Sequence, residues 1–371
     1  MGKQLYRQTI MSIKPYVPGL PVEEVERELG ISNVIKLASN ENPLGPSPAA
    51  MQALRELVPK VHVYPDGNCY YLKNALAAQL GFGAENLIVG NGSDEIIKFI
   101  AEAFLEPGEE AVVADPTFSE YDFAVKVMGG KTVVVPAVNM THDLPSMAAA
   151  VTEKTKLVFV CNPNNPTGTI VRRAEVEAFL DRLPEGVIVV FDEAYYEYVV
   201  DREYSQTLDF VRQGRDVIVL RTFSKIYGLA GLRVGYGVAR PELIGYLSRV
   251  REPFNVNMAA QAAAQAALGD TEHLARSRDL NEKGKDFLAA EFARLGLKAT
   301  PTEANFFWVN IAADCRKVFA GMLRRGVIVR TGDIFGAPDT IRVTIGTPEQ
   351  NRRLVDTLEE VLAVEKANAA P

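Results

Sequence analysis

Polar residues that could carry out chemistry follow several apolar runs of this chain. Asp192 comes directly after the run 187–191, and Lys225 lies shortly after the run 217–220. A lysine that is partly withdrawn from water has a lowered pKa and can form a Schiff base with an aldehyde. A carboxylate at the end of a buried run needs a partner, which could be a helix N-terminus, an arginine or a protonated ring nitrogen. The two residue types together suit chemistry at a carbonyl group.

A glycine turn over residues 90–94 could bind an anion. It follows the apolar run 87–89 and precedes a helical pattern. Free backbone N–H groups at the start of a helix, together with the helix dipole, attract negative charge. The alternative is an ordinary strand-to-helix turn that is capped by Ser93 or Asp94.

The turn 162–168 and the residues around Lys225 supply further polar groups. The turn contains two prolines and one glycine. It is either a rigid turn only, or a device that fixes Asn165 at the edge of a sheet to donate a hydrogen bond. Ser224 precedes Lys225, and Arg233 follows it eight residues later, so that both could hold a phosphate beside the lysine.

Two nucleotide-binding motifs are excluded. Residues 90–95 lack the third glycine of the G-x-G-x-x-G motif that binds dinucleotides. The one Gly-Lys-Thr sequence, at 130–132, has Val125 where a phosphate-binding loop requires glycine, and a strand pattern follows it instead of a helix.

Short apolar segments that alternate with helical patterns must position these residues. The six clearest segments are apolar on both faces, as expected for the buried strands of a mostly parallel sheet. They are 87–89, 111–114, 133–135, 157–160, 187–191 and 217–220. Ligands of open α/β sheets bind beyond the carboxyl ends of the strands. We therefore expect the polar residues after these strands to meet at one edge of the sheet.

The pattern changes after about Gly237. Helices are expected from near Pro241, over 258–268 and over 271–295. Short strands are expected at 306–310, 327–330 and 341–345. This mixture predicts a smaller α+β domain, and the Pro-rich first 40 residues are expected to wrap onto that domain or onto another subunit.

The composition is typical of a soluble globular protein of about two domains. The chain has 371 residues, of which 47% are hydrophobic, and a net charge of −7, which argues against nucleic acid or an anionic membrane as a partner. The N-terminus lacks the apolar region of a secretory signal, Tyr6 does not fit a myristoylation motif, and no apolar run is long enough for a membrane helix. Three scattered cysteines without a C-x-x-C pair predict reduced thiols in the cytoplasm and no metal site.

The polar groups that follow four of these runs, 87–89, 157–160, 187–191 and 217–220, match the requirements of one cofactor. Pyridoxal phosphate needs a lysine for a Schiff base, an acid for its ring nitrogen and a cup for its phosphate. Asp192 would keep the ring nitrogen protonated, so that the ring accepts electrons from a substrate carbanion. Lys225, once displaced by substrate, would move the Cα proton.

With these residues in view, the chain resembles the fold-type I pyridoxal-phosphate aminotransferases, and within them the histidinol-phosphate aminotransferase group. Besides the polar residues that follow the four apolar runs, the motifs that carry the resemblance are KLASNENPLG at 36–45, YPD at 64–66, LAGLR at 229–233 and IRVTIGT at 341–347. The resemblance implies an α/β fold: a large domain with a mostly parallel seven-stranded sheet flanked by helices, plus a small α+β domain. It implies an N-terminal arm at 1–40 that is part of the small domain, a large cofactor domain at 41–255 and a small C-terminal domain at 256–371.

The resemblance also implies a role for each matching residue. Lys225, Asp192 and Tyr195 would be the catalytic residues, and Asn165 with Tyr195 would bind the ring oxygen of the cofactor. Phe118 would stack on the ring; many members have tyrosine there, so stacking is retained without a hydroxyl. The remaining cofactor contacts would be Ser93, Asp94, Thr222, Ser224, Arg233 and, from the neighbouring subunit of a homodimer, Tyr64. The substrate contacts would be Tyr16, Asn40, Arg330 and Arg342.

The implied reaction is transfer of the amino group of L-histidinol phosphate to 2-oxoglutarate, in histidine biosynthesis. The same residues would also serve an aromatic amino-acid aminotransferase or a pyridoxal-phosphate decarboxylase of a phosphorylated amino acid. A catalytically silent cofactor-binding module is a further alternative, against which Lys225, Asp192 and Arg233 argue. Whether Arg342 meets a phosphate or a carboxylate stays open.

Overall fold

Seven strands form the central sheet, in the order β2–β8–β7–β6–β5–β3–β4. The computed structural model describes residues 5–13, 15 and 19–369. The strands are β2 (Leu87–Gly90), β3 (Glu110–Asp115), β4 (Lys131–Pro136), β5 (Thr155–Cys161), β6 (Ile188–Asp192), β7 (Val217–Thr222) and β8 (Gly235–Ala239). β8 is antiparallel to both its neighbours, and the other pairs are parallel. The prediction of a mostly parallel seven-stranded sheet is therefore confirmed.

β8 is not among the six strands predicted from apolar runs. Glycines at 235 and 237 interrupt its apolar pattern, and glycine is poorly represented in strands. The packing explains why they are glycines. A Cβ on Gly235 would lie 2.6 Å from the backbone nitrogen of Ser93, and one on Gly237 would lie 3.1 Å from the side chain of Ile88. The two glycines thus allow β8 to lie close to the start of α4 and to β2.

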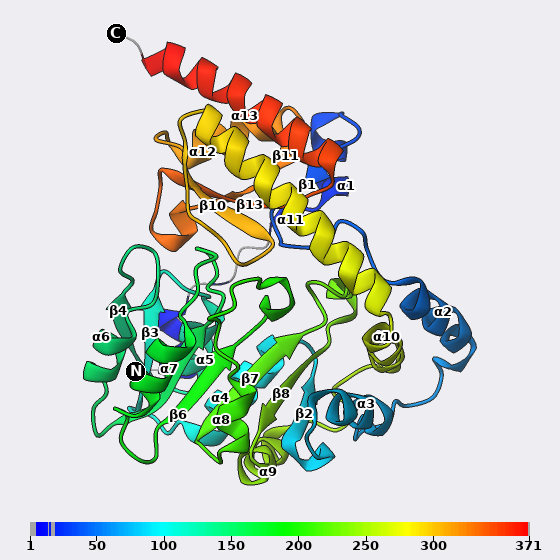
Figure 1. Cartoon of the computed structure of the whole chain (residues 1–371), viewed down its shortest axis with the longest axis vertical. Helices are drawn as coiled ribbons and strands as arrows, with labels where there is room; N and C mark the ends of the chain where they lie inside the picture. Colours follow the sequence, from blue (N-terminus) through cyan, green and yellow to red (C-terminus); the bar gives the residue numbers. More distant parts are fainter. Residues whose placement is uncertain (1–4, 14, 16–18, 370–371) are drawn as a thin grey trace.

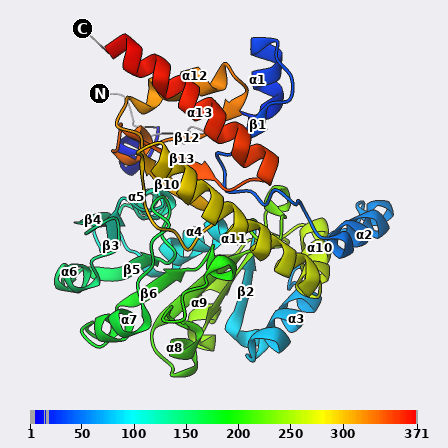
Figure 2. The same cartoon turned by 45° about the horizontal axis from the view of Figure 1, so that its top comes forward.

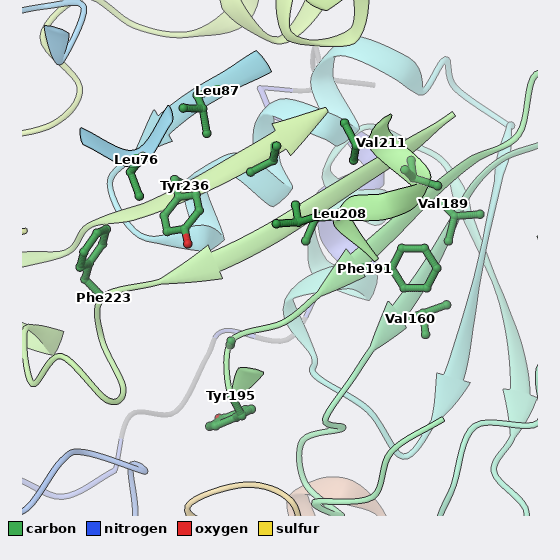
Figure 3. Close-up of a cluster of buried hydrophobic side chains, with 14 of the residues drawn as sticks. Leu76, Leu87, Val160, Val189, Phe191, Tyr195, Leu208, Val211, Phe223 and Tyr236 are labelled. Carbon is green, nitrogen blue, oxygen red and sulfur yellow. The ribbon is translucent and has the colours of Figure 1, made fainter. Parts of the chain in front are cut away.

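Helices cover both faces of this sheet (Figure 1). One face packs against α4 (Ser93–Phe104), α5 (Glu120–Val127) and α9 (Pro241–Val250). The other packs against α3 (Tyr70–Leu80), α6 (Leu144–Ala149), α7 (Arg173–Leu180), α8 (Leu208–Arg212) and α10 (Met258–Leu268), and α2 (Pro48–Leu57) lies on α10. Figure 3 shows Val189 and Phe191 of β6 in this second cluster, with Tyr195 on the loop that follows the strand.

The pleat of β6 separates the two acidic residues at its end. Ile188 and Val190 belong to the cluster under α4 and α5, whereas Val189 and Phe191 belong to the opposite cluster. Because side chains alternate along a strand, Asp192 continues the first face and Glu193 turns to the second.

The C-terminal part forms a second layer above the carboxyl edge of the sheet (Figures 1 and 2). Its strands β9 (Lys298–Ala299), β10 (Phe306–Asn310), β12 (Arg330–Thr331) and β13 (Thr340–Thr344) make an antiparallel sheet in the order β12–β13–β10–β9. It packs on α11 (Thr271–Arg294), α12 (Cys315–Leu323) and α13 (Pro348–Ala369). The α+β character predicted for this part is confirmed. The predicted strand 327–330 is two strands, because β11 (Val327–Ile328) pairs with the N-terminal segment whereas β12 joins the antiparallel sheet.

The N-terminal segment is divided between the two parts of the molecule. β1 (Ile35–Lys36) pairs in parallel with β11, and Val25 of α1 (Val22–Leu29) packs with Ile328. The 3-10 helix Gln8–Ser12 instead contacts α5 of the large sheet. At the other predicted boundary, the alanines of α10 pack in the cluster of the large sheet. The domain limits at 40 and 255 stay predictions.

Local signals in the sequence set the long helices that link the two parts. Asn257 accepts a hydrogen bond from the Ala260 amide at the start of α10, and Asp270 accepts one from the His273 amide at the start of α11. α10 has the bounds predicted for it, and α11 ends within one residue of its predicted end. Among the described residues, none of the helices is both long and apolar enough to cross a membrane.

Candidate active site

A cavity of about 260 Å³ lies at the carboxyl edge of the large sheet and is closed on the other side by residues of β12 and β13. It is lined by thirteen of the residues predicted for the site: Asn40, Ser93, Asp94, Phe118, Asn165, Asp192, Tyr195, Thr222, Ser224, Lys225, Arg233, Arg330 and Arg342. The parallel strands end at this edge, so residues far apart in the sequence converge there. Of the other two predicted residues, Tyr64 does not line the cavity: it is 79% exposed and stacks on Phe254. Tyr16 falls outside the described residues.

Asp192 is a buried acid with both oxygens hydrogen-bonded. Its Oδ2 accepts a bond of 2.7 Å from the hydroxyl of Tyr121, and its Oδ1 accepts one of 3.1 Å from the Ala194 amide. Burial raises the pKa of Asp192 to about 6, against the lowering by these two hydrogen bonds. A buried carboxylate of this kind is stabilised by a cation placed against it, as a protonated ring nitrogen would be.

Lys225 is half-buried on the other side of the same cavity. Its Nζ donates to the backbone oxygen of Ser39 over 3.3 Å and lies 5.5 Å from the centre of the Tyr195 ring. Burial, followed by the nearby charge of Arg342, lowers the pKa of Lys225 from 10.5 to about 8. A larger share of this amine is therefore neutral near pH 7 than of an exposed lysine, and the neutral amine is the nucleophile.

One end of the cavity has the donors that a phosphate requires. α4 begins at Ser93 after Gly92, and no side chain of the described residues caps it. The Arg233 guanidinium lies so close to Gly92 that a Cβ there would come within 2.5 Å of its Nη2. The hydroxyls of Thr222 and Ser224 are 3.0 Å apart, and Arg233 Nη1 donates to Ser224 over 3.4 Å. Backbone amides, hydroxyls and an arginine form the donor set expected for a bound phosphate.

Hydrogen bonds join the large and small parts across the cavity. Arg342 donates from Nη1 to Asn165 Oδ1 over 2.6 Å, and from Nη2 to the Ala38 oxygen over 2.7 Å. Asn40 Nδ2 donates to the Tyr195 hydroxyl over 3.0 Å. The Tyr195 hydroxyl accepts this bond and keeps its own proton for donation. Asn165 and Tyr195 thus present donor groups near Lys225, as the predicted contact to a ring oxygen requires.

Arg330 and Arg342 form a basic wall on the small sheet. They are directly opposite each other on the antiparallel strands β12 and β13, so both side chains lie on the same face of the sheet. The Arg342 guanidinium also lies 5.4 Å and 5.9 Å from the ring centres of Phe306 and Phe335. Two adjacent arginines suit a doubly charged anion.

The structure adds residues that the sequence patterns did not identify. Ser39, Glu41, Cys161 and Ala194 line the cavity, and Tyr121 bonds Asp192 from behind it. Cys161 ends β5 and lies opposite Asp192 in register. Tyr121 follows Phe118 closely in the sequence, and their ring centres are 5.6 Å apart, but no local pattern links Tyr121 to Asp192.

These groups fit pyridoxal phosphate. The acid, the amine of lowered pKa and the phosphate donors occupy one cavity, and each is held by contacts of its own. The cavity contains both kinds of charge that the cofactor requires: the negative Asp192 for its ring nitrogen and the positive Arg233 for its phosphate. Among the described residues, no cluster of three histidine, cysteine, aspartate or glutamate side chains could hold a metal ion.

Comparison with known proteins identifies the family. The family model of the class I and II aminotransferases matches residues 32–358, and the chain therefore belongs to that family. A histidinol-phosphate aminotransferase of Moorella thermoacetica is 63% identical over 96% of this chain and 93% of its own length. Another of that name, from Carboxydothermus hydrogenoformans, is 49% identical over 97% of this chain and 100% of its own.

A solved structure has the same fold. It is that of a histidinol-phosphate aminotransferase from Sinorhizobium meliloti in complex with pyridoxal-5'-phosphate, with a TM-score of 0.90 and 28% identity. The match covers 98% of this chain and 99% of that one. The chain thus has the fold-type I architecture that the sequence predicted.

Proposed function

We propose that this enzyme transfers the amino group of L-histidinol phosphate to 2-oxoglutarate, with pyridoxal phosphate as cofactor, in histidine biosynthesis. The products would be imidazole acetol phosphate and L-glutamate. The observation that carries the proposal is the cavity in which Lys225 and Asp192 lie together beneath the paired arginines of β12 and β13. The names of the relatives, at up to 63% identity over nearly the full chain, support the substrate.

The residues of the chain divide the chemistry among them. Bound pyridoxal phosphate supplies an electron-accepting ring that stabilises negative charge at the substrate Cα. Asp192 would hold the proton of the ring nitrogen through its carboxylate. Asn165 and Tyr195 would donate hydrogen bonds to the ring oxygen, and Phe118 would stack on the ring. The amides at the start of α4 and the side chains of Ser224 and Arg233 would hold the phosphate.

Lys225 would bind the cofactor through a Schiff base and would also act as the base of the reaction. Its neutral Nζ would accept the proton that leaves the substrate Cα and hold it for return, whereas the bound cofactor would carry the amino group. The lowered pKa makes the neutral form accessible near neutral pH. Nζ lies among Ser39, Tyr195 and the charge of Arg342, in a cavity that shields it from bulk water.

Arg330 and Arg342 would bind the anionic group of each substrate. Two guanidinium groups side by side fit the phosphate of histidinol phosphate, and one guanidinium is a bidentate partner for a carboxylate of 2-oxoglutarate. Asn40 lies next to these arginines: its backbone N–H donates to the Thr344 hydroxyl of β13, and its side chain donates to the Tyr195 hydroxyl. Tyr16 stays a predicted substrate contact.

A homodimer in the cytoplasm is part of the proposal. An exposed apolar group on the large domain supports the dimer: Val58, Val61, Val63, Tyr64, Tyr70 and Tyr71 are each more than half exposed. Exposed large apolar side chains that form one surface are typical of protein interfaces. In the dimer Tyr64 would contact the cofactor phosphate of the neighbouring subunit. Three free, buried cysteines are consistent with a reducing compartment.

A substrate panel tests the proposed function. Purified enzyme loaded with pyridoxal phosphate is given histidinol phosphate, phenylalanine, tyrosine or threonine phosphate, each with and without 2-oxoglutarate, and glutamate is measured. Histidinol phosphate is expected to give the highest kcat/KM. Preference for phenylalanine and tyrosine would indicate the aromatic aminotransferase instead. Release of carbon dioxide from threonine phosphate without a keto acid would indicate the decarboxylase.

A further inference from the structure

Tyr121 contacts the reactive end of the cavity without lining it. It lies on α5, fully buried, and its hydroxyl donates the 2.7 Å hydrogen bond to Asp192 Oδ2. Asp192 itself is only 3% exposed. Among the described residues, two groups thus donate hydrogen bonds to the carboxylate: this hydroxyl and the Ala194 amide, which bonds Oδ1.

The ring of Tyr121 is fixed by packing on two sides. It stacks on Phe159 of β5, with ring centres 4.7 Å apart and an interplanar angle of 11°. Its edge meets the Phe118 ring at 5.6 Å. Phe159 and Asp192 belong to the same face of the sheet, because Phe159 packs in the cluster under α4 and α5. The hydroxyl thus has one location, set by the sheet and by α5 together.

We propose that Tyr121 is a positioning residue for Asp192, which fixes the carboxylate in the orientation that receives the ring nitrogen of the cofactor and favours its ionised form. With Oδ2 bound to Tyr121 and Oδ1 bound to Ala194, the carboxylate cannot rotate without the loss of a buried hydrogen bond. This proposal rests on the proposed use of pyridoxal phosphate. It assigns no substrate, so it does not depend on histidinol phosphate.

The charges around Asp192 show why its ionised form needs support. Burial and the negative charge of Asp94 both raise the pKa of Asp192, whereas the bonds from Tyr121 and Ala194 and the charge of Lys225 lower it. The neighbouring Cys161 has a raised pKa because of burial, and its neutral thiol offers no charge to the carboxylate. Of the lowering groups, only the Tyr121 hydroxyl can be removed by one substitution that keeps the packing.

The test is Tyr121→Phe, which keeps the ring and removes the hydroxyl. A hydrogen bond to a charged group contributes enough that its loss should weaken binding of pyridoxal phosphate by about 10- to 100-fold. The dissociation constant is measured by fluorescence of the apoenzyme with pyridoxal phosphate as the probe. The absorbance of the bound cofactor is titrated with pH in the same samples, and the spectroscopic pKa should shift as the charge on Asp192 is lost. Tyr204→Phe is the matched control, since Tyr204 is also a buried tyrosine whose hydroxyl bonds Asn162 and Glu193 outside the cavity.

A double substitution separates positioning from simple packing. If Tyr121 acts through Asp192, Tyr121→Phe should have little further effect on the dissociation constant in an Asp192→Asn background. Equal and additive effects in the two backgrounds would overturn the proposal, as would wild-type affinity and spectrum in Tyr121→Phe. An enzyme that prefers phenylalanine would overturn the proposed substrate and leave this inference intact. Failure of the wild-type protein to bind pyridoxal phosphate would overturn both.

Discussion

At the scale of single residues, burial adjusts two groups in opposite directions. The same cavity lowers the pKa of Lys225 to about 8 and raises that of Asp192 to about 6. Loss of water disfavours the charged form of each group, whichever sign that charge has. Near pH 7 a larger share of Lys225 is therefore neutral, and a larger share of Asp192 protonated, than of exposed groups of the same kind. Both shifts favour a ligand that is an aldehyde for the lysine and a protonated ring for the acid.

The shifted lysine predicts how capture of the cofactor depends on pH. Only the neutral amine attacks an aldehyde, so the rate constant for covalent capture of pyridoxal phosphate by the apoenzyme should rise about tenfold per unit below pH 8 and level off above it. Stopped-flow absorbance measures this rate. A free lysine derivative with a pKa of 10.5 gives the reference profile, which should still rise at pH 9. Lys225→Ala should show no covalent capture, and a rate that rises with pH up to 10 in the wild type would contradict the lowered pKa.

At the scale of elements, the ends of β6 and β7 carry a second polar pair on the opposite face of the sheet. Arg221 Nη2 lies 2.8 Å from Glu193 Oε2, and both side chains are almost fully buried. The Arg221 guanidinium also lies 3.6 Å from the centre of the Tyr196 ring. The pleat places them away from the cavity, although each is next in sequence to a predicted site residue. Their ion pair joins the ends of two neighbouring parallel strands.

Removal of one member of this pair should destabilise the protein strongly. Glu193→Ala leaves Arg221 buried without its carboxylate, which costs about 3–5 kcal/mol. Urea unfolding of the holoenzyme measures the change. The control is Glu177→Ala, which breaks an exposed pair with Arg173 on α7 and should change stability by no more than about 0.5 kcal/mol. Equal effects of the two substitutions would contradict the structural role of the buried pair.

The close contact between β8 and α4 predicts a different effect. Gly235→Ala would place a Cβ 2.6 Å from the Ser93 nitrogen and 3.0 Å from the Arg221 oxygen, so backbone at the start of α4 must move. We expect a loss of about 1–3 kcal/mol in stability and weaker binding of pyridoxal phosphate. Gly245→Ala is the control, because no described atom lies within 4 Å of a Cβ there and its position within α9 should make alanine stabilising by about 0.5–1 kcal/mol. Unchanged cofactor affinity in Gly235→Ala would show that the start of α4 does not hold the phosphate.

At the scale of the whole molecule, the cavity depends on two layers that meet. Arg342 of the small sheet bonds Asn165 of the large domain and Ala38 of the N-terminal segment. The lysine and the acid come from the large sheet alone, whereas the basic wall comes from β12 and β13. Under the proposed function, the large sheet would therefore supply most of the cofactor contacts and the small sheet the arginines for the substrate.

Complementation between subunits tests the proposed dimer. Lys225→Ala and Tyr64→Ala each impair every site of their own homodimer, but a mixed dimer would contain one site with both wild-type residues. Random mixing should therefore restore about a quarter of wild-type activity. Unfolding and refolding the two variants together, followed by an aminotransferase assay, measures the recovery. Mixed Lys225→Ala and Asp192→Asn samples are the control and should not recover, because both residues belong to the same subunit's site. No recovery in the first mixture would contradict a contribution of Tyr64 across the interface.

The sequence by itself determined six of the seven strands of the large sheet and the edge at which the polar residues after them gather. Runs of apolar residues predict buried parallel strands, and parallel strands bring their carboxyl ends to one edge, so the residues after each run had to converge. The pattern of the chain is therefore enough to place Lys225, Asp192 and Arg233 together. The helix 258–268 could be bounded to the residue because Asn257 caps its start and Gly269 follows its end.

Only the tertiary structure decided the contacts between distant segments. Tyr121 and Asp192 are 71 residues apart, and Arg342 and Asn165 are 177 apart, so no local pattern links them. β8 was not predicted because Gly235 and Gly237 interrupt its apolar pattern. These glycines are required by the close approach of neighbouring elements, which the local sequence does not show. Asp192 lines the cavity whereas Glu193 pairs with Arg221, because the pleat directs the two side chains to opposite faces of the sheet. Local patterns report the hydrophobicity and the period of a segment, whereas the partner of a buried polar group depends on how the layers meet.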